Sequence, residues 1–83
     1  VKIKTQIRYK VIADKKISSI NYNFEVVNGN LYIIGIAQNK KELKRVVEHA
    51  NDISGVFKVV SHVMMKEDSR RIKYQRKLQK RND

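Results

Sequence analysis

Histidine is the side chain best suited to acid–base chemistry near neutral pH, and the sequence contains two, His49 and His62. They fall on different expected elements, without a His-x-x-x-His pair and without any cysteine in the chain. A metal site would need further carboxylate ligands to converge on them. Catalysis would need a nucleophile, a base and an orienting group together, and no spacing suggests such a group. We therefore predict a non-enzymatic chain with no catalytic residue, metal site or cofactor, and expect both histidines at the surface or a strand edge.

Lysine and arginine offer a second kind of chemistry, the binding of anions. The chain has 19 Lys and Arg against 8 Asp and Glu, which gives a formal net charge of +11. A field of this sign favours phospholipid headgroups, nucleic acid or an acidic protein, and it also suits a surface that only keeps the protein soluble. The residues predicted to bind lipid or another anion are Lys40, Lys41, Lys44, Arg45, Arg70, Arg71, Lys73, Arg76 and Lys77.

These cations form two clusters. Lys40 and Lys41 occupy the first turn of an expected helix, where the helix dipole disfavours cations by roughly a few tenths of a kcal/mol each. A cost accepted at this place indicates a surface kept for binding. The tail cations form the denser cluster, and each can contribute about 1 kcal/mol near an anionic membrane surface. Tyr74 and Leu78 are spaced to share a helical face beside them.

The first half of the chain predicts a helix and a hairpin. Apolar residues recur on one helical face at Ile3, Ile7 and Val11, and the helix should end near Asp14. Alternation then predicts a half-buried strand whose inner residues are Ile20, Tyr22, Phe24 and Val26. Asn28-Gly29 predicts a type I′ turn. The second strand, over residues 31–36, is apolar on both faces and is expected to be the more buried one.

The second half predicts a helix and a third strand. Asn39 and Glu42 have the spacing of a capping box at a helix start. The buried stripe of this helix is expected at Leu43, Val46, Val47 and Ala50. Gly55 allows a turn, and residues 56–63 are rich in β-branched side chains and predict the third strand. Strand order stays open, because the third strand could pair with either of the others.

These elements predict an α+β fold of order αββαβ, in which two helices pack on one face of a three-stranded mixed sheet. We expect one domain over residues 1–65 and a basic C-terminal tail over residues 66–83, frayed or partly helical. The longest purely apolar run, residues 31–34, is far shorter than a membrane span of roughly 18–20 residues. Because the chain begins at Val1, we expect an upstream piece, which could be a signal peptide, a lipid anchor or a further domain.

Residues 21–63 resemble the BON domain, a family of small bacterial envelope modules. The hairpin sequence Asn-Gly-Asn-Leu-Tyr-Ile-Ile-Gly at 28–35 is similar to the family's glycine-bounded hydrophobic hairpin. The sequence Ile-Ser-Gly-Val-Phe-Lys-Val-Val at 53–60 is similar to its glycine-valine entry into the last strand. With the first helix the resemblance covers residues 3–64. Gly29, Gly35 and Gly55, which carry it, are interpreted as structural, because only glycine adopts strained turns and close approaches freely.

The resemblance implies a non-enzymatic αββαβ domain associated with phospholipids, envelope maintenance, osmotic stress response and secretin-type proteins. We therefore predict a membrane-associated domain of the periplasm or envelope, with an anionic phospholipid surface as partner, further envelope proteins, and no small-molecule substrate. The alternatives are a nucleic-acid-binding basic domain and a protein-interaction module docking through its sheet edge. Nucleic acid is less favoured, because the strands show no set of stacking aromatics and no G-x-x-G clamp. The family often has two copies in tandem, and the tail is outside its pattern.

Overall fold

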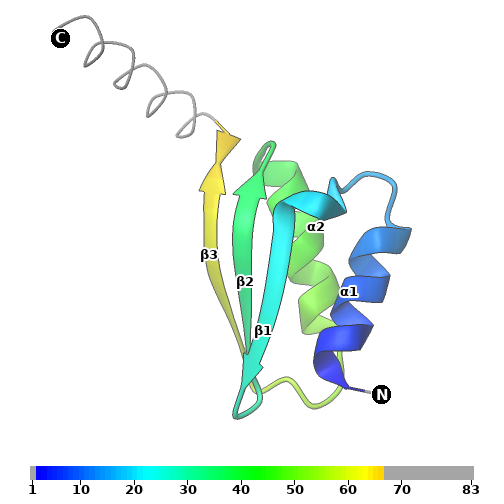
Figure 1. Cartoon of the computed structure of the whole chain (residues 1–83), viewed down its shortest axis with the longest axis vertical. Helices are drawn as coiled ribbons and strands as arrows, with labels where there is room; N and C mark the ends of the chain where they lie inside the picture. Colours follow the sequence, from blue (N-terminus) through cyan, green and yellow to red (C-terminus); the bar gives the residue numbers. More distant parts are fainter. Residues whose placement is uncertain (1, 67–83) are drawn as a thin grey trace, which may run out of the picture.

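The computed structural model of the protein describes residues 2–66, so the predicted tail lies outside the described residues apart from Lys66. The elements follow the predicted αββαβ order, with one additional 3-10 turn, η1 (Figure 1). Their bounds are α1 Ile3–Ala13, η1 Ser19–Asn21, β1 Tyr22–Val27, β2 Asn30–Ala37, α2 Lys40–Asn51 and β3 Lys58–Met65.

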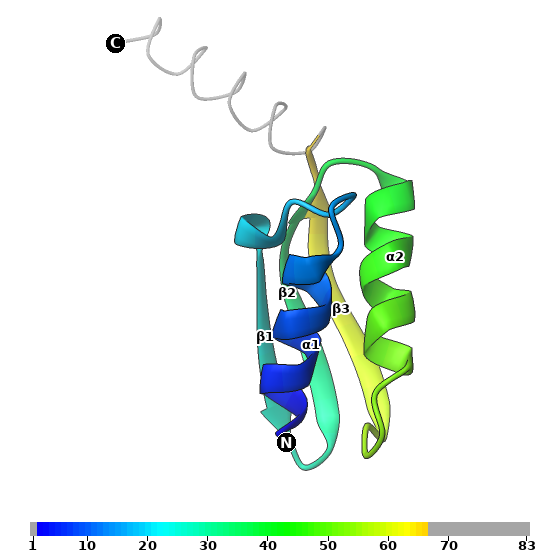
Figure 2. The ribbon, with the colours of Figure 1, turned by 90° about the vertical axis from the view of Figure 1, so that its right-hand side faces the viewer.

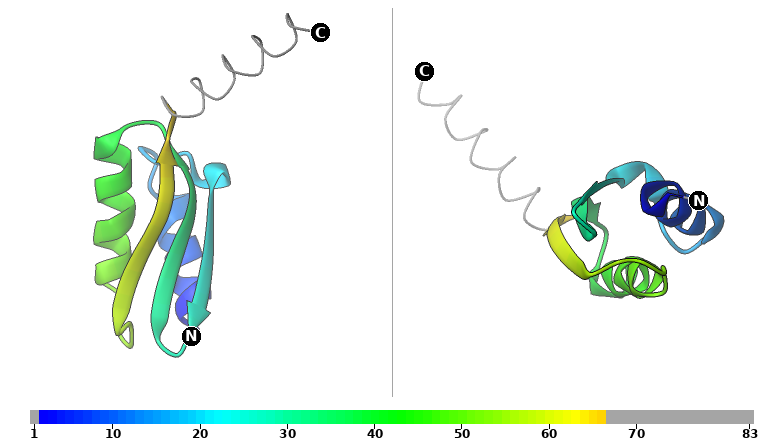
Figure 3. Two further views of the ribbon diagram at one scale, coloured as in Figure 1. Left: turned by 90° about the vertical axis from the view of Figure 1, so that its left-hand side faces the viewer. Right: turned by 90° about the horizontal axis from the view of Figure 1, so that it is seen from below.

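The sheet has the order β1-β2-β3, which settles the strand order that the sequence left open. Strand β2 pairs antiparallel with β1 and parallel with β3, so the sheet is mixed. Both helices lie on the same face of this sheet, as Figure 2 and the right-hand view of Figure 3 show. The predicted α+β architecture is confirmed.

Backbone conformation at two glycines shapes the hairpin. Asn28 and Gly29 have φ values of 52° and 80°, both positive as a type I′ turn requires. At Gly35 (φ 154°), a Cβ atom would lie 2.1 Å from the carbonyl oxygen of Asn21. The absence of a side chain at Gly35 therefore lets η1 pack directly against β2.

The core lies between the helices and the covered face of the sheet. Alternate residues of β1 and β2 point into it, and α1 and α2 each contribute the face that the sequence predicted. Its buried apolar side chains are Ile7, Val11, Ile17, Tyr22, Phe24, Leu31, Ile33, Ala37, Val46, Ala50 and Ile53. Leu43 and Val47, which were expected in the stripe of α2, are partly buried and pack against this cluster.

Ile20 differs from its prediction. It was expected on the inner face of the first strand, but it lies in η1 and its side chain is 92% exposed. The N–H of Asn21 donates to the carbonyl of Ser18 over 3.1 Å, which closes a turn at this place. The strand therefore begins only at Tyr22, because the turn interrupts the alternation before it.

The burial of β2 also differs from its prediction. The strand is central, and Leu31, Ile33 and Ala37 on one face are buried. Ile34 and Ile36 on the opposite face remain 43% and 40% exposed. The physical reason is that both helices cover the same face, so the other face of the sheet stays open.

Candidate functional site

Asp14 joins the end of α1 to α2. Its Oδ2 atom lies 2.8 Å from Nε2 of His49 and 2.9 Å from a terminal guanidinium nitrogen of Arg45. Oδ1 accepts a hydrogen bond from the N–H of Lys16 at 3.0 Å. These contacts, the hydrogen bond with His49 first among them, lower the pKa of Asp14 to about 2. The carboxylate therefore stays ionised and fixes the loop after α1 beside α2.

Glu42 is the second anchor of this loop, and it is only 5% exposed. Its carboxylate accepts hydrogen bonds from the Tyr22 hydroxyl at 2.6 Å and from the N–H groups of Ser18 and Gln38, both at 3.1 Å. The Asn39 side chain caps α2 as predicted, accepting from the N–H of Glu42 at 2.9 Å. The Glu42 side chain turns inward instead of completing a capping box. Burial and this carboxylate together raise the pKa of Tyr22.

The contacts of Asp14 and Glu42 bring together cations that are distant in the sequence. Lys16 lines one hollow with Lys41, Lys44 and Arg45, and a neighbouring hollow includes Lys15, Lys16 and Arg45. We call these five residues the basic end; it lies at the top of Figure 1, where α1 ends and α2 begins. Arg45 is half-buried and paired with Asp14. The four lysines are exposed and form no ion pair within residues 2–66.

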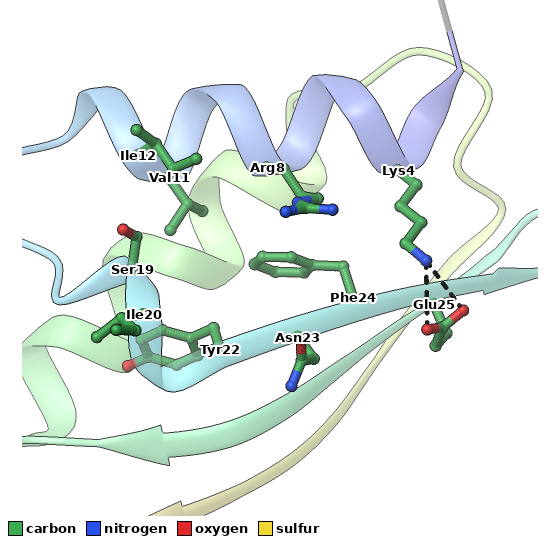
Figure 4. Close-up of a pocket in the computed structure, with 10 residues that line it drawn as sticks. All are labelled: Lys4, Arg8, Val11, Ile12, Ser19, Ile20, Tyr22, Asn23, Phe24 and Glu25. Carbon is green, nitrogen blue, oxygen red and sulfur yellow. Dashed lines mark hydrogen bonds and ion pairs between the residues drawn. The ribbon is translucent and has the colours of Figure 1, made fainter.

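Two large aliphatic side chains project close to this end. Ile12 in α1 is 63% exposed, and Ile20 in η1 is almost fully exposed. Both line a groove of about 300 Å³ between α1 and β1 (Figure 4). Its buried lining residues are Tyr22 and Phe24 of β1 and, on the opposite side, Val11 of α1.

The groove also carries charge. Arg8 projects into it above Phe24 in Figure 4 and forms no ion pair with another described residue. Lys4 is engaged with Glu25 at 3.3 Å, an exposed pair. Exposed aliphatic side chains beside unpaired cations are the features by which peripheral proteins enter a membrane interface. The described residues contain no cluster of metal-ligating side chains, and none of their helices is long and apolar enough to cross a membrane.

The predicted anion-binding residues that the structure describes lie on α2. Lys40 and Lys41 are exposed in the first turn of α2, and Lys44 follows one turn later on the exposed side. The tail residues Arg70, Arg71, Lys73, Arg76 and Lys77 lie outside the described residues. Sequence reasoning did not single out Lys15, Lys16, Ile12 or Ile20 as site residues. The adjacent lysines were a visible signal, but their position beside α2 depends on the contacts of Asp14 and Glu42.

The histidines occupy different environments. His49, expected on the solvent side of its helix, is half-buried because it faces Asp14 of α1. His62 is exposed on β3, and its ring stacks on Tyr32 with a centroid distance of 6.2 Å. Neither belongs to a described group of metal-ligating residues.

The structure is a small α+β domain with a basic, partly apolar end. The family model described as "BON domain" matches residues 1–67, and the chain belongs to this family. BON domains are generally non-enzymatic binding domains. The chain is also 39% identical over 64 residues to a protein of Anaplasma centrale described as "Uncharacterized protein in gshII 5'region". The match covers 77% of this chain and 42% of the relative, so the chain spans less than half of the relative's length.

Proposed function

We propose that this BON domain binds anionic phospholipid surfaces peripherally. The observation that carries the proposal is the exposure of Ile12 and Ile20 at the same end of the molecule as four exposed lysines that form no ion pair within residues 2–66. The lysines would approach lipid phosphates while the two isoleucines enter the interface between headgroups and acyl chains. Family membership supports the same partner.

The expected free energy of membrane binding has an electrostatic part from the lysines and an apolar part from the two isoleucines. Each cation near an anionic leaflet contributes about 1 kcal/mol, and burying an isoleucine side chain fully contributes roughly 1.5–3 kcal/mol. Ile12 and Ile20 begin largely exposed, so most of this apolar gain is available on binding. The electrostatic share weakens with salt, because the Debye length falls from about 10 Å at 0.1 M to about 3 Å at 1 M.

The proposal includes a location in the periplasm or at the envelope, where the resemblance would place a phospholipid partner. The proposed role at this location is a contribution to envelope maintenance under osmotic stress. The test is fractionation of cells that express the full-length protein from its own gene, followed by detection in cytoplasmic, periplasmic and membrane fractions. Recovery in the cytoplasmic fraction alone would contradict this location.

Co-sedimentation with lipid vesicles tests the binding itself. Wild-type protein should bind phosphatidylcholine vesicles increasingly as phosphatidylglycerol is added, and added NaCl should release it. Lys15→Glu combined with Lys41→Glu should weaken binding at least tenfold, and Ile20→Ser should weaken binding with less effect on its salt dependence. Binding that ignores the anionic lipid fraction would overturn the proposal.

The opposite end of the molecule offers matched controls. Phe57 is 85% exposed and Lys58 is exposed, and both lie next to the hairpin turn, where the Phe57 N–H donates to the Gly29 carbonyl at 2.8 Å. Phe57→Ser and Lys58→Glu therefore remove the same kinds of side chain without changing the basic end. These variants should bind vesicles like the wild type. Equal losses at both ends would indicate nonspecific attraction of a positively charged chain.

A gel-shift titration separates lipid from nucleic acid, since both present phosphate. Nucleic-acid binding through charge alone should fall with Lys15→Glu and Lys41→Glu but remain unchanged with Ile20→Ser. Tighter binding to RNA or DNA than to anionic vesicles at physiological salt would favour the nucleic-acid alternative.

A further inference from the structure

The sheet face away from the helices is apolar and uncovered within the described residues. The left-hand view of Figure 3 shows the three strands facing the viewer, with α1 behind them and α2 beside β3. Val27, Ile34 and Met64 are 53%, 43% and 42% exposed on it. We define the open face by its apolar members Val27, Tyr32, Ile34, Ile36, Val60 and Met64.

The strand register makes this face continuous. Ile34 of β2 lies opposite His62 of β3, and Tyr32 lies opposite Val60. The ring of His62 stacks on Tyr32 at an interplanar angle of 12°. Cross-strand neighbours of this kind support one another on a sheet surface. The centre of the open face is therefore an ordered apolar layer that spans adjacent strands.

Charge is nearly absent from this face. The outward positions of the three strands carry two charged residues, Glu25 on β1 and Lys58 on β3, and these have opposite signs. The whole chain, by contrast, has a net charge of +11. Two copies that meet through this face therefore keep the lysines of the basic end away from the contact.

We infer that the open face binds a second copy of this chain, sheet against sheet. A two-fold axis along β2 would lay β1 of each copy over β3 of the other, which is a closed, isologous arrangement. Glu25 lies level with Tyr32, and Lys58 lies level with Asn30, two residues away along β2. This offset is about 7 Å along the strand, and stacked sheets are about 10 Å apart, so the lysine and glutamate side chains together span the distance.

The two edge charges therefore make the face complementary to itself. Glu25 of each copy would lie near Lys58 of the other, and the pair would form twice. Glu25 is now paired with Lys4 on the exposed edge. Exposed pairs of this kind contribute about 0–1 kcal/mol, so exchange of partner costs little. The apolar centre supplies the attraction, and the edge charges select the orientation.

Sedimentation equilibrium of the full chain in lipid-free buffer tests this inference. The wild type should show a monomer–dimer equilibrium between micromolar and millimolar concentration. Ile34→Glu should weaken dimerisation at least tenfold, because it places like charges at the centre of both faces. Ile12→Glu, on α1 away from the open face, should dimerise like the wild type. Circular dichroism checks that both variants are folded.

A charge exchange tests the orientation. Glu25→Lys and Lys58→Glu should each weaken dimerisation, and the double variant should recover it, since the swapped charges meet again across the contact. A wild type that stays monomeric up to millimolar concentration would overturn the inference, as would an Ile34→Glu variant that dimerises normally. Because no lipid is present, failure here is distinct from failure to bind vesicles.

Discussion

The replacement of Glu42 by Gln tests whether one buried carboxylate holds the basic end together. Oε1 of Glu42 accepts from Tyr22 and Gln38, and Oε2 accepts from Ser18. A glutamine keeps one acceptor oxygen but places an NH₂ group where the other oxygen was. At least one donor then loses its partner and faces a second donor. Because the side chain is almost fully buried, water can replace little of the loss.

The magnitude follows from these three contacts. A hydrogen bond to a charged group contributes about 1.5–3 kcal/mol, and an unsatisfied buried donor costs about 1–3 kcal/mol. We expect Glu42→Gln to lower the free energy of unfolding by about 2–4 kcal/mol, with a Tm decrease of roughly 10 °C or more. Tyr22→Phe removes one donor to the same carboxylate and should cost about 1.5–3 kcal/mol.

Urea unfolding followed by circular dichroism at neutral pH measures both effects. Glu48→Gln is the matched control, since this residue is exposed on the same helix and should change stability by no more than about 0.5 kcal/mol. Tyr22→Phe and Glu42→Gln share a hydrogen bond, so their combined effect should be smaller than the sum of the single effects. A Glu42→Gln variant as stable as the control would refute the reasoning, as would strictly additive single effects.

Two further predictions concern the backbone and acid. Gly35→Ala should lower the free energy of unfolding by about 2 kcal/mol or more, because the new Cβ would clash with the Asn21 carbonyl; urea unfolding would show it, and a neutral result would disprove the close contact. The pKa of Asp14 falls from 3.8 to about 2 on folding, so its stabilising effect is complete above about pH 4 and is lost towards pH 2. Asp14→Asn should therefore be less stable at neutral pH and lose less stability across this window; parallel pH profiles for variant and wild type would contradict this.

Local patterns in the sequence were sufficient for most of the fold. Three correct predictions depend only on residues that are close in the sequence. They are the four-residue apolar spacing in α1, the Asn39 cap of α2 and the Asn28-Gly29 turn. Periodicity reports such local requirements directly, because each helix or strand must present one apolar face to a core. The family resemblance likewise depended on short segments around the turns, and the match over residues 1–67 confirms it.

Predictions were wrong where a local turn or a distant contact overrides the periodic pattern. Ile20 continues the alternation of the strand, yet the turn at Ser19–Asn21 leaves it exposed. Glu42 satisfies a capping pattern, yet its carboxylate turns to the hydroxyl of Tyr22, which is twenty residues away. The spacing of residues within one helix or strand does not predict a hydrogen bond to a side chain on another element.

The sequence by itself determined the charge of this protein, the order of its elements and its family. Lys40, Lys41 and Lys44 were identifiable as a cationic group because they lie on one short helix. Their meeting with Lys15 and Lys16 was decided only in the tertiary structure, because Asp14 and Glu42 must bind groups from other elements to place the loop. The exposure of the open face also depends on the tertiary structure. Strand β2 is apolar on both sides in sequence, and only the packing of both helices on one side leaves Ile34 and Ile36 in contact with solvent.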